Sequence, residues 1–380
     1  MTLKILVVAE NNSWMNPHIV NSMEAMGHRV NRFYYGDYVG EFYGHARRHE
    51  QIAKNKMLVN LAKSLQDENG LDLIFCYVYD DFLMPQYAKA LSDLHIPMVN
   101  YNVDMPGQWF RQTRTASYFD LMLCAQLDHI MDLKKYSKKV LYFPMAALSK
   151  SPNSSNNIEK INNIAFLGTA TPYRRYVFSH LAKQLHDFSI YGKYWNELQS
   201  DAIIRHISRT FKDIRYYGWP RYRAEGVSRL WKIFLERLSI RKNKILDDYI
   251  PSQLLKGKLS DDDLLTVFQR SKINIGVTRC ENDNPHQIGR CQMKLRDFEV
   301  PMAGGFYLVE KAPGYDQLFV DGKEVVTWQT LDELSEKIDY YLKHDDEREA
   351  IALAGQKRAM RDHTWEARFN TLFLELGLIK

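Results

Sequence analysis

The sequence predicts an α/β protein built from two doubly wound parallel sheets. The chain has 380 residues, about the length of two domains of roughly 150 to 200 residues each. Short, almost continuously apolar runs alternate with amphipathic segments, as expected for strands that helices cover on both faces. Hydrophobic residues make up 45% and charged residues 26% of the chain, which is an ordinary globular composition. These observations exclude a disordered or fibrous chain and favour parallel sheets.

Six strand-like runs occur in the first 150 residues. They are KILVVAE from Lys4, HRVNRFYY from His28, DLIFCYV from Asp72, PMVNYNV from Pro97, FDLMLCA from Phe119 and KKVLYF from Lys138. The helical patterns between them predict a first Rossmann-like domain over residues 1–150. This domain ends at SKSPNSSNNIEK from Ser149, whose composition is typical of an exposed linker.

A second series of five strand-like runs follows the linker. They are NIAFLG from Asn163, FSIYG from Phe188, INIGVTR from Ile273, FYLVE from Phe306 and EVVTW from Glu324. They predict a second Rossmann-like domain over residues 151–363, followed by an amphipathic helix over 364–380. In open α/β sheets, ligands lie beyond the carboxyl ends of the strands, so we expect function in a central cleft that the two domains face.

Charge and cysteine content narrow the function class. The net charge of +5 is mild; it suits a phosphorylated substrate or an anionic membrane surface and does not indicate a nucleic-acid-binding protein. The four cysteines lack metal-binding spacing and are interpreted as reduced, mostly structural residues. The apolar start reaches Glu10 too soon for a signal peptide, and no run approaches the roughly 18 to 20 apolar residues of a membrane span. The sequence therefore predicts a cytoplasmic protein.

A basic helical insertion over about 195–258 interrupts the second domain. Its segment RYRAEGVSRLWKIFLERLSIRKNK from Arg221 carries apolar residues at helical spacing among many Lys and Arg. Such a helix could lie on the anionic inner face of a membrane. The alternative is an extra helix that packs on the second domain and exposes a solvated, charged face.

The loop after NIAFLG is a candidate phosphate site. It reads GTATPYRR from Gly168, and its Thr-Pro pair suits the start of a helix. Arg174 and Arg175 then fall in the first turn, where cations oppose the helix dipole unless an anion is bound. We expect Gly168, Thr169 and one of the two arginines to hold a phosphate. The alternative is an arginine paired with a surface carboxylate.

A second candidate segment is KLRDFEVPMAGGFYLVE from Lys294. We expect a helix from about Cys291 to Ala303, ended by a glycine pair in the manner of a glycine C-cap. Glu299 would lie at the border of its buried stripe, which consists of Leu295, Phe298 and Met302. The helix start would direct free amides into the cleft as a second anion site.

These residues resemble a known family. KLRDFEVPMAGGFYLVEKAPGYDQLFVDGKEVVTWQTLDELSEKI from Lys294 and AGQKRAMRDHTWEARF from Ala354 look like the C-terminal domain of GT-B-type glycosyltransferases, especially the group that includes the spore-maturation protein CgeB. The resemblance is strong over about 258–369, weaker over the first domain and absent from the insertion. It implies two domains facing a cleft, with the last helix packed back on the first domain.

The resemblance also implies roles for individual residues. The glutamate that matches Glu299 hydrogen-bonds the ribose of a nucleotide-sugar donor. Amides at the start of the same helix, here those of Met293, Lys294 and Leu295, meet the diphosphate together with the Gly168 loop. Many retaining relatives carry a second glutamate where this chain has Cys291. Contacts to the donor sugar could instead come from a loop whose candidates are Asn284, His286 and Gln287, although a polar surface loop is the alternative for each of them.

The first domain is expected to supply the acceptor side. Its candidates are Asn11, Asn12 and Trp14 in the loop after the first strand, and Trp109 farther along. Asp104 ends a strand and could be the general base; the alternative is an aspartate that begins the following turn or helix. Asp80 and Asp81 are weaker candidates for the same role.

The sequence therefore predicts a glycosyltransferase that moves a sugar from a nucleotide-diphosphate sugar, of UDP or GDP type, to a hydroxyl of a glycan or lipid-linked acceptor. Bacterial surface-glycan or glycoconjugate synthesis is the expected setting. Helix ends and basic side chains would stabilise the leaving group, so no cofactor or metal is expected. The acidic run Asp261–Asp263 is interpreted as a helix start. The alternatives are a nucleotide-sugar epimerase of the same fold and a non-catalytic nucleotide-sugar-binding protein.

Overall fold

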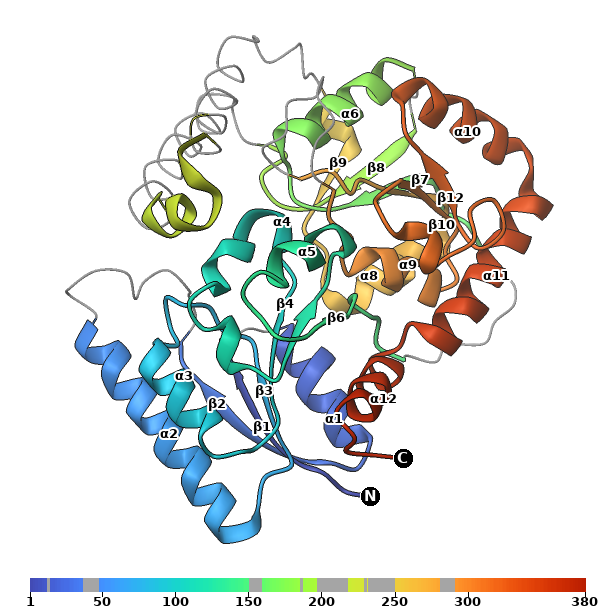
Figure 1. Cartoon of the computed structure of the whole chain (residues 1–380). Helices are drawn as coiled ribbons and strands as arrows, with labels where there is room; N and C mark the ends of the chain where they lie inside the picture. The colour runs from blue at the N-terminus through green and yellow to red at the C-terminus, as the bar shows by residue number, and fades with distance from the viewer. Residues whose placement is uncertain are drawn as a thin grey trace. The chain divides into compact units, whose positions relative to one another are not determined.

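The structure is a computed structural model that describes residues 1–11, 14–36, 48–149, 159–184, 187–196, 218–228, 231, 250–280 and 291–380 (Figure 1). The chain divides into two compact units. The first unit comprises Met1–Leu148, Thr210–Leu230 and Trp365–Lys380, and the second comprises Ser149–Arg209 and Trp231–Thr364.

The first unit contains a six-stranded sheet in the order β2-β1-β3-β4-β5-β6, and every neighbouring pair is parallel. Its strands are β1 Lys4–Ala9, β2 Arg29–Tyr34, β3 Leu73–Cys76, β4 Met98–Asn102, β5 Leu121–Cys124 and β6 Val140–Tyr142. Each of the six predicted runs contains one of them. β3, β4 and β5 are buried at every position, which explains why their sequences are apolar without interruption.

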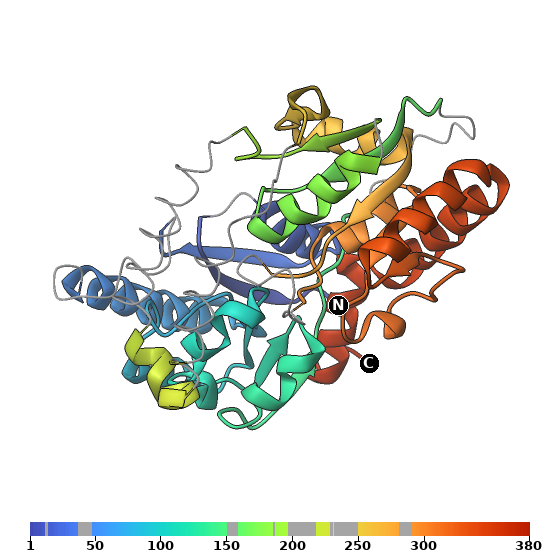
Figure 2. The same cartoon turned by 90° about the horizontal axis from the view of Figure 1, so that it is seen from above.

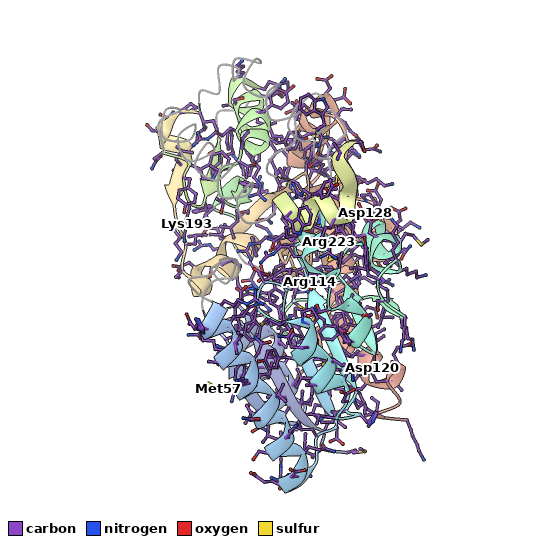
Figure 3. The ribbon with its side chains drawn as sticks, turned by 60° about the vertical axis from the view of Figure 1, so that its left-hand side comes forward. Met57, Arg114, Asp120, Asp128, Lys193 and Arg223 are labelled. Atoms are coloured by element: carbon purple, nitrogen blue, oxygen red, sulfur yellow. The ribbon has the colours of Figure 1, made fainter. Side chains whose placement is uncertain are left out.

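Helices connect these strands. They are η1 Asn16–Val20, α1 Asn21–Ala25, α2 Arg48–Asn69, α3 Pro85–Ser92, α4 Met105–Gln108, η3 Trp109–Gln112, η4 Ala116–Tyr118, η5 Leu127–His129 and α5 Ile130–Leu133. The last helix, α12 Trp365–Glu375, belongs to the same unit. Its Trp365 indole donates to His18 Nδ1 at 2.9 Å, and Phe369 packs edge-on against Phe75. Figure 3 shows Met57 on the outer face of α2, where 61% of this residue is exposed.

The second unit contains another six-stranded parallel sheet, in the order β12-β11-β10-β7-β8-β9. Its strands are β7 Asn162–Leu167, β8 Phe188–Tyr191, β9 Leu255–Gly257, β10 Ser271–Gly276, β11 Tyr307–Glu310 and β12 Val326–Trp328. Counted from its own first strand, this is the order 3-2-1-4-5-6 of dinucleotide-binding sheets, which hold ligands where the strand order reverses. That point lies between β7 and β10.

The helices of the second unit are α6 Pro172–Gln184, η6 Ser252–Leu254, α8 Asp261–Arg270, α9 Arg296–Met302, η7 Tyr315–Gln317, α10 Leu331–Lys343 and α11 Asp345–Asp362. α10 and α11 lie side by side (Figure 2). Ser260 caps α8 by accepting a hydrogen bond from the amide of Asp263. The acidic run at Asp261 therefore begins a helix, as predicted.

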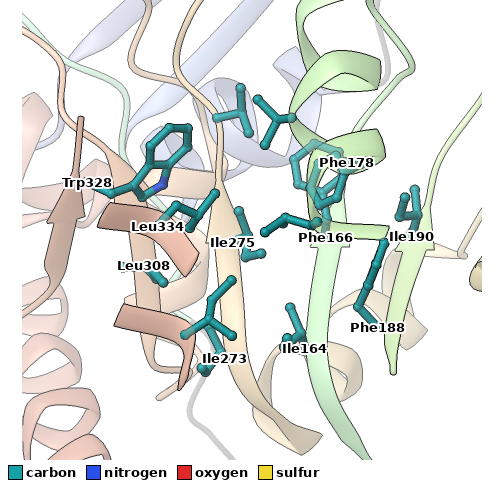
Figure 4. Packing of buried hydrophobic residues seen from close by; sticks show 14 of the residues in the cluster. Ile164, Phe166, Phe178, Phe188, Ile190, Ile273, Ile275, Leu308, Trp328 and Leu334 are labelled. Carbon is teal, nitrogen blue, oxygen red and sulfur yellow. The ribbon is translucent and has the colours of Figure 1, made fainter. Parts of the chain in front are cut away.

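Aromatic side chains pack the core of the second unit around the strands that bear the candidate site (Figure 4). The rings of Phe166 on β7 and Phe178 on α6 lie 4.4 Å apart between centroids, and Trp195 meets Phe178 edge-on. Burial of these large rings fixes α6 against β7. The loop that joins them is therefore held at both ends by the core.

The predicted basic insertion over 195–258 falls mostly outside the described residues. Residues 218–228 are helical and belong to the first unit. Arg221 lies over the ring of Phe110, 4.6 Å from its centroid, and donates to the Gly107 carbonyl at 3.1 Å. Trp219 and Tyr222 stack on one another and are 67% and 41% exposed; Figure 3 labels Arg223 on the same helix. Among the described residues, every helix is too short or too polar to cross a membrane.

Candidate functional site

The candidate site lies at the carboxyl ends of β7, β10 and β11 in the second unit. A small hollow there is lined by Lys294 and by residues of β7, β10, β11, α6, α8 and α9, including Arg174 and Asp297. It coincides with the reversal point of the strand order, where such sheets bind ligands. Both segments singled out from the sequence therefore meet at one edge.

The glycine loop after β7 is closely packed. The Gly168 amide donates to the Tyr191 carbonyl at 2.9 Å, and the Gly168 carbonyl accepts from the Trp195 indole at 2.8 Å. A Cβ at Gly168 would lie 2.9 Å from Arg174 Nη1 and from the Phe166 ring. Only glycine fits here without displacing the arginine.

Arg174 curls back over this loop. Thr171 Oγ1 caps α6 by accepting from the Arg174 amide at 3.2 Å, and α6 begins at Pro172, both as the Thr-Pro pair predicts. The Arg174 guanidinium donates to the Thr169 carbonyl at 2.8 Å. Its positive charge is thus held beside Gly168 and Thr169, although their binding of a phosphate stays a prediction.

Arg175 serves a different segment. Its guanidinium donates to the carbonyls of Tyr194 and Trp195 at 2.5 and 3.0 Å and lies over the Trp195 indole. These contacts brace the loop after β8. Of the two arginines, the structure therefore favours Arg174 for an anion at the glycine loop.

Lys294 adds a second positive charge to the same place. Its ammonium donates to the Val277 carbonyl at 3.1 Å, so it lies at the end of β10. Burial, with a contribution from Arg174, lowers the pKa of Lys294 to about 8. A lysine whose charged form is disfavoured gains from an anionic ligand. The sequence resemblance implies a diphosphate contact only for the backbone amide of Lys294.

Asp297 holds Lys294 in position. Its carboxylate accepts from the Lys294 amide at 2.6 Å and from the Tyr307 hydroxyl at 3.4 Å. Burial raises the pKa of Asp297 to about 6, and the bond from the Lys294 amide opposes that shift. Because the Lys294 amide already donates to Asp297, Lys294 would bind an anion through its side-chain ammonium.

The helix that carries Glu299 begins later than predicted. α9 starts at Arg296, because Cys291 forms an isolated antiparallel bridge with Arg279 and the Gln292 amide donates to the Thr278 carbonyl at 2.8 Å. Pairing with a distant strand end thus replaces the first helical turn. Met293 and Leu295 therefore precede the helix: Met293 is buried, and Leu295 is a half-buried N-cap rather than part of the buried stripe.

The predicted burial pattern of α9 and its glycine end are confirmed, whereas the anion site at its start stays a prediction. Phe298 and Met302 are buried, Glu299 is half-buried at their border, and Gly304 ends the helix with a φ of 77°. Glu299 forms an ion pair with Arg296, one turn earlier on the same face. This partner could have been found from the sequence, since residues three apart are neighbours on a helix. The ribose contact of Glu299 stays a prediction.

The first-unit candidates are spread over several loops. Asp104 directly precedes α4 and is partly exposed. Trp109 is only 6% exposed and packs near Tyr136, which favours a packing role. Trp14 meets Tyr77 edge-on, and the Asn11 amide donates to the Gly36 carbonyl at 2.9 Å. The remaining candidates, Asn12, Asn284, His286 and Gln287, lie outside the described residues.

Asp80 and Asp81 brace the loop after β3. Asp81 is buried and paired with Arg111, which also lies over the Tyr79 ring. Asp80 accepts from the Thr115 hydroxyl and amide at 2.7 and 3.1 Å. Burial raises the pKa of Asp80 to about 7, against the effect of the Thr115 bond. These contacts give both carboxylates a structural role.

Residues 174–373 match the model of the glycosyl transferase-like family. This range covers more than half of the chain. The chain belongs to the glycosyl transferase-like family. Arg174, Lys294 and Glu299 lie within the matched range of this glycosyl transferase-like chain, whereas Gly168 and Thr169 precede it.

Solved structures support the same fold. A glycosyltransferase from Rickettsia africae is similar with a TM-score of 0.59 and 10% identity, over 99% of this chain and 97% of that one. Sucrose-phosphate synthase from Thermosynechococcus elongatus gives 0.57 and 12%, over 99% of both chains. Anabaena HepE, solved in complex with UDP-glucose, also gives 0.57 and 12%, over 99% and 100%. The predicted fold class, GT-B with two Rossmann-like domains, is confirmed.

One neighbour matches the rival function. A putative UDP-N-acetylglucosamine 2-epimerase from Listeria monocytogenes is similar with a TM-score of 0.51 and 8% identity, over 100% of this chain and 98% of that one. At this identity the likeness concerns the fold alone. No curated protein sequence matches the chain.

Proposed function

We propose that this protein is a glycosyltransferase that moves a sugar from a nucleotide-diphosphate sugar to an acceptor hydroxyl. The observation that carries the proposal is the placement of Arg174 and Lys294 beside the Gly168 loop, at the carboxyl ends of β7 and β10. Both residues lie within the family match. Two positive charges beside a glycine that leaves the backbone accessible suit a diphosphate.

The donor would be held by parts of the second unit. Gly168, Thr169 and Arg174 would bind the diphosphate together with Lys294, and the backbone of residues 293–295 would approach it. Arg175 would act by bracing the neighbouring loop. Glu299 would accept hydrogen bonds from the ribose hydroxyls, while its partner Arg296 orients it.

In the reaction, the bond between the sugar C1 and the diphosphate oxygen breaks, and the nucleoside diphosphate leaves with the electron pair. The acceptor oxygen forms the new bond to C1 and gives up its proton, for which Asp104 is the proposed base. Arg174 and Lys294 would stabilise the charge that develops on the leaving group, so we propose that transfer needs no metal and no cofactor. Activity should then survive an excess of EDTA.

We further propose that the protein is CgeB-like within this family and that its donor is a UDP- or GDP-sugar. The proposed acceptor is a bacterial surface glycan or a lipid-linked molecule. HepE was solved with UDP-glucose, which makes UDP-glucose the first donor to test. Asn284, His286 and Gln287 would contact the donor sugar. Asn11, Asn12 and Trp14 would contribute to the acceptor side, and the buried Trp109 would support it by packing. The exposed Trp219 and Tyr222 beside Arg223 favour peripheral contact with an anionic membrane. The protein should sediment with anionic liposomes at low salt and remain in solution with neutral ones.

The decisive experiment measures release of nucleoside diphosphate from UDP-glucose and its relatives, with and without candidate acceptors. A transferase releases UDP or GDP when acceptor is present and forms a new glycoside. An epimerase would change the sugar without acceptor. A binding protein would be stabilised against heat by the donor and turn none of it over, hydrolysis included. Either of the last two results would contradict the proposal.

A further inference from the structure

We infer that Glu310, at the carboxyl end of β11, is a positioning residue that sets the two cationic side chains of the proposed diphosphate site. This inference rests on the proposed function and deepens it. Glu310 is 2% exposed, and a buried carboxylate is retained only where its charge is matched by donors.

The carboxylate of Glu310 accepts from four donors. Its Oε1 accepts from the Tyr173 hydroxyl at 2.7 Å and pairs with Arg279 Nη2 at 3.1 Å. Its Oε2 accepts from the amides of Thr278 and Arg279 at 3.1 and 2.9 Å. A carboxylate has about four acceptor positions, so all are occupied within the protein. Glu310 therefore acts through its neighbours rather than as a ligand.

These donors come from the two elements that carry the cations. Tyr173 directly precedes Arg174 in the first turn of α6. Thr278 and Arg279 directly follow Val277, whose carbonyl receives the Lys294 ammonium at 3.1 Å. Glu310 thus connects the first turn of α6, which carries Arg174, to the end of β10, which binds the Lys294 ammonium. A shift of either support would move a positive charge away from the glycine loop, and small displacements of such groups weaken anion binding strongly.

Two further contacts make the network rigid. The Arg279 guanidinium lies over the Tyr173 ring, 4.3 Å from its centroid, so the two side-chain partners of Glu310 also contact one another. The Thr278 hydroxyl donates to the Glu310 carbonyl at 3.1 Å. Burial, with the neighbouring Glu310 charge, raises the pKa of Tyr173. Its hydroxyl therefore stays protonated as a donor to the carboxylate.

The test compares Glu310→Gln with the wild-type protein for binding of UDP and GDP, and of uridine and guanosine, by titration calorimetry. The amide side chain has nearly the same shape but only one acceptor oxygen, so two donors lose their partner. We expect the affinity for the bound nucleoside diphosphate to fall by about tenfold or more, and the affinity for its nucleoside to change little. If Glu310→Gln only destabilised the unit as a whole, the affinities for nucleoside diphosphate and nucleoside would fall by the same factor, and that result would overturn the inference.

Two more variants keep the test decisive if Glu310→Gln does not fold. Tyr173→Phe removes one hydrogen-bond donor to Glu310. It should weaken binding of the nucleoside diphosphate by a smaller factor than Glu310→Gln does, and leave nucleoside binding unchanged. Asp321→Asn is the matched control: Asp321 accepts hydrogen bonds from the hydroxyl and amide of Thr327 at 2.6 and 2.8 Å in the turn that leads into the amino end of β12. It should lower the melting temperature without changing nucleotide affinity.

The failures are distinguishable. If the wild-type protein binds neither UDP nor GDP, the proposed function fails and takes the inference with it. If the wild type binds one of them and both Glu310→Gln and Tyr173→Phe keep its full affinity, the proposed function stands and the positioning role is refuted.

Discussion

The carboxyl edges of the two sheets use their charges differently. In the first unit, Asp81 and Arg111 are buried and neutralise one another, and Asp80 is occupied by Thr115 and its neighbours. In the second unit, Arg174 and Lys294 are held by backbone carbonyls beside a glycine loop. A carbonyl bonds a cation but does not cancel its charge. Related sheet orders thus carry a buried carboxylate–guanidinium pair at the edge of one unit and, at the edge of the other, two cations held by carbonyls with the carboxylates of Asp297 and Glu310 nearby.

This difference indicates where the anionic part of a substrate belongs. A diphosphate needs fixed positive charge, which the second unit supplies. A hydroxyl acceptor is neutral and needs hydrogen bonds and one base, which the first unit can supply through a residue such as Asp104. The Asp81–Arg111 pair should therefore matter for stability, and Arg174 and Lys294 for binding.

The largest expected effect is on stability in the first unit. Arg111→Met leaves the buried Asp81 carboxylate without its partner, which should cost about 3 to 5 kcal/mol of unfolding free energy. Chemical denaturation measures it. The double variant Asp81→Asn with Arg111→Met should recover part of the loss. A single variant as stable as the wild type would show that this pair is not structural.

The next effect is on binding in the second unit. Lys294→Met removes a positive charge from the proposed diphosphate site and should weaken UDP or GDP binding by about 10- to 100-fold. It should cost far less stability than Arg111→Met, because burial already disfavours the charged form of this lysine. Lys337→Met is the matched control, since Lys337 pairs with Glu333 on α10. Equal loss of affinity in both variants would contradict a local role for Lys294.

A smaller effect is expected at the glycine loop. In Gly168→Ala the added Cβ would meet Arg174 and the Phe166 ring at 2.9 Å, so the guanidinium must move. We expect a loss of nucleotide affinity of about tenfold. Gly218→Ala is the control, because a Cβ there has no atom within 4 Å. Unchanged affinity in Gly168→Ala would indicate that the position of Arg174 is unimportant for binding.

The smallest effect concerns pH. The pKa of Lys294 is lowered to about 8, so its charge is complete below that value and is lost as the pH rises through it. Diphosphates are already fully ionised there, since their last pKa is about 6 to 7. Nucleotide affinity should therefore fall above about pH 8 in the wild type and stay level in Lys294→Met. Parallel profiles for the two proteins would exclude Lys294 as the titrating group.

The strands could be predicted and parts of the site could not. Buried strands such as β3 and β5 are continuous apolar runs, whereas β9 has three residues that include Gly257 and gives no such signal. The start of α9 was misplaced because Cys291 pairs with Arg279, a contact that local spacing does not show. Glu310 was missed for the same reason, since its donors lie 31 to 137 residues away along the chain.

The most direct measurement of the central claim, a donor nucleotide bound by the second unit with its ribose on Glu299, is a binding cycle. UDP, or GDP if that is the base bound, is titrated together with its 2′,3′-dideoxy analogue into the wild type and Glu299→Ala. The wild type should prefer the ribonucleotide by about tenfold, as hydrogen bonds to a charged group predict, and Glu299→Ala should lose that preference. A Glu299→Ala protein that binds the ribonucleotide as tightly as the wild type would contradict the account.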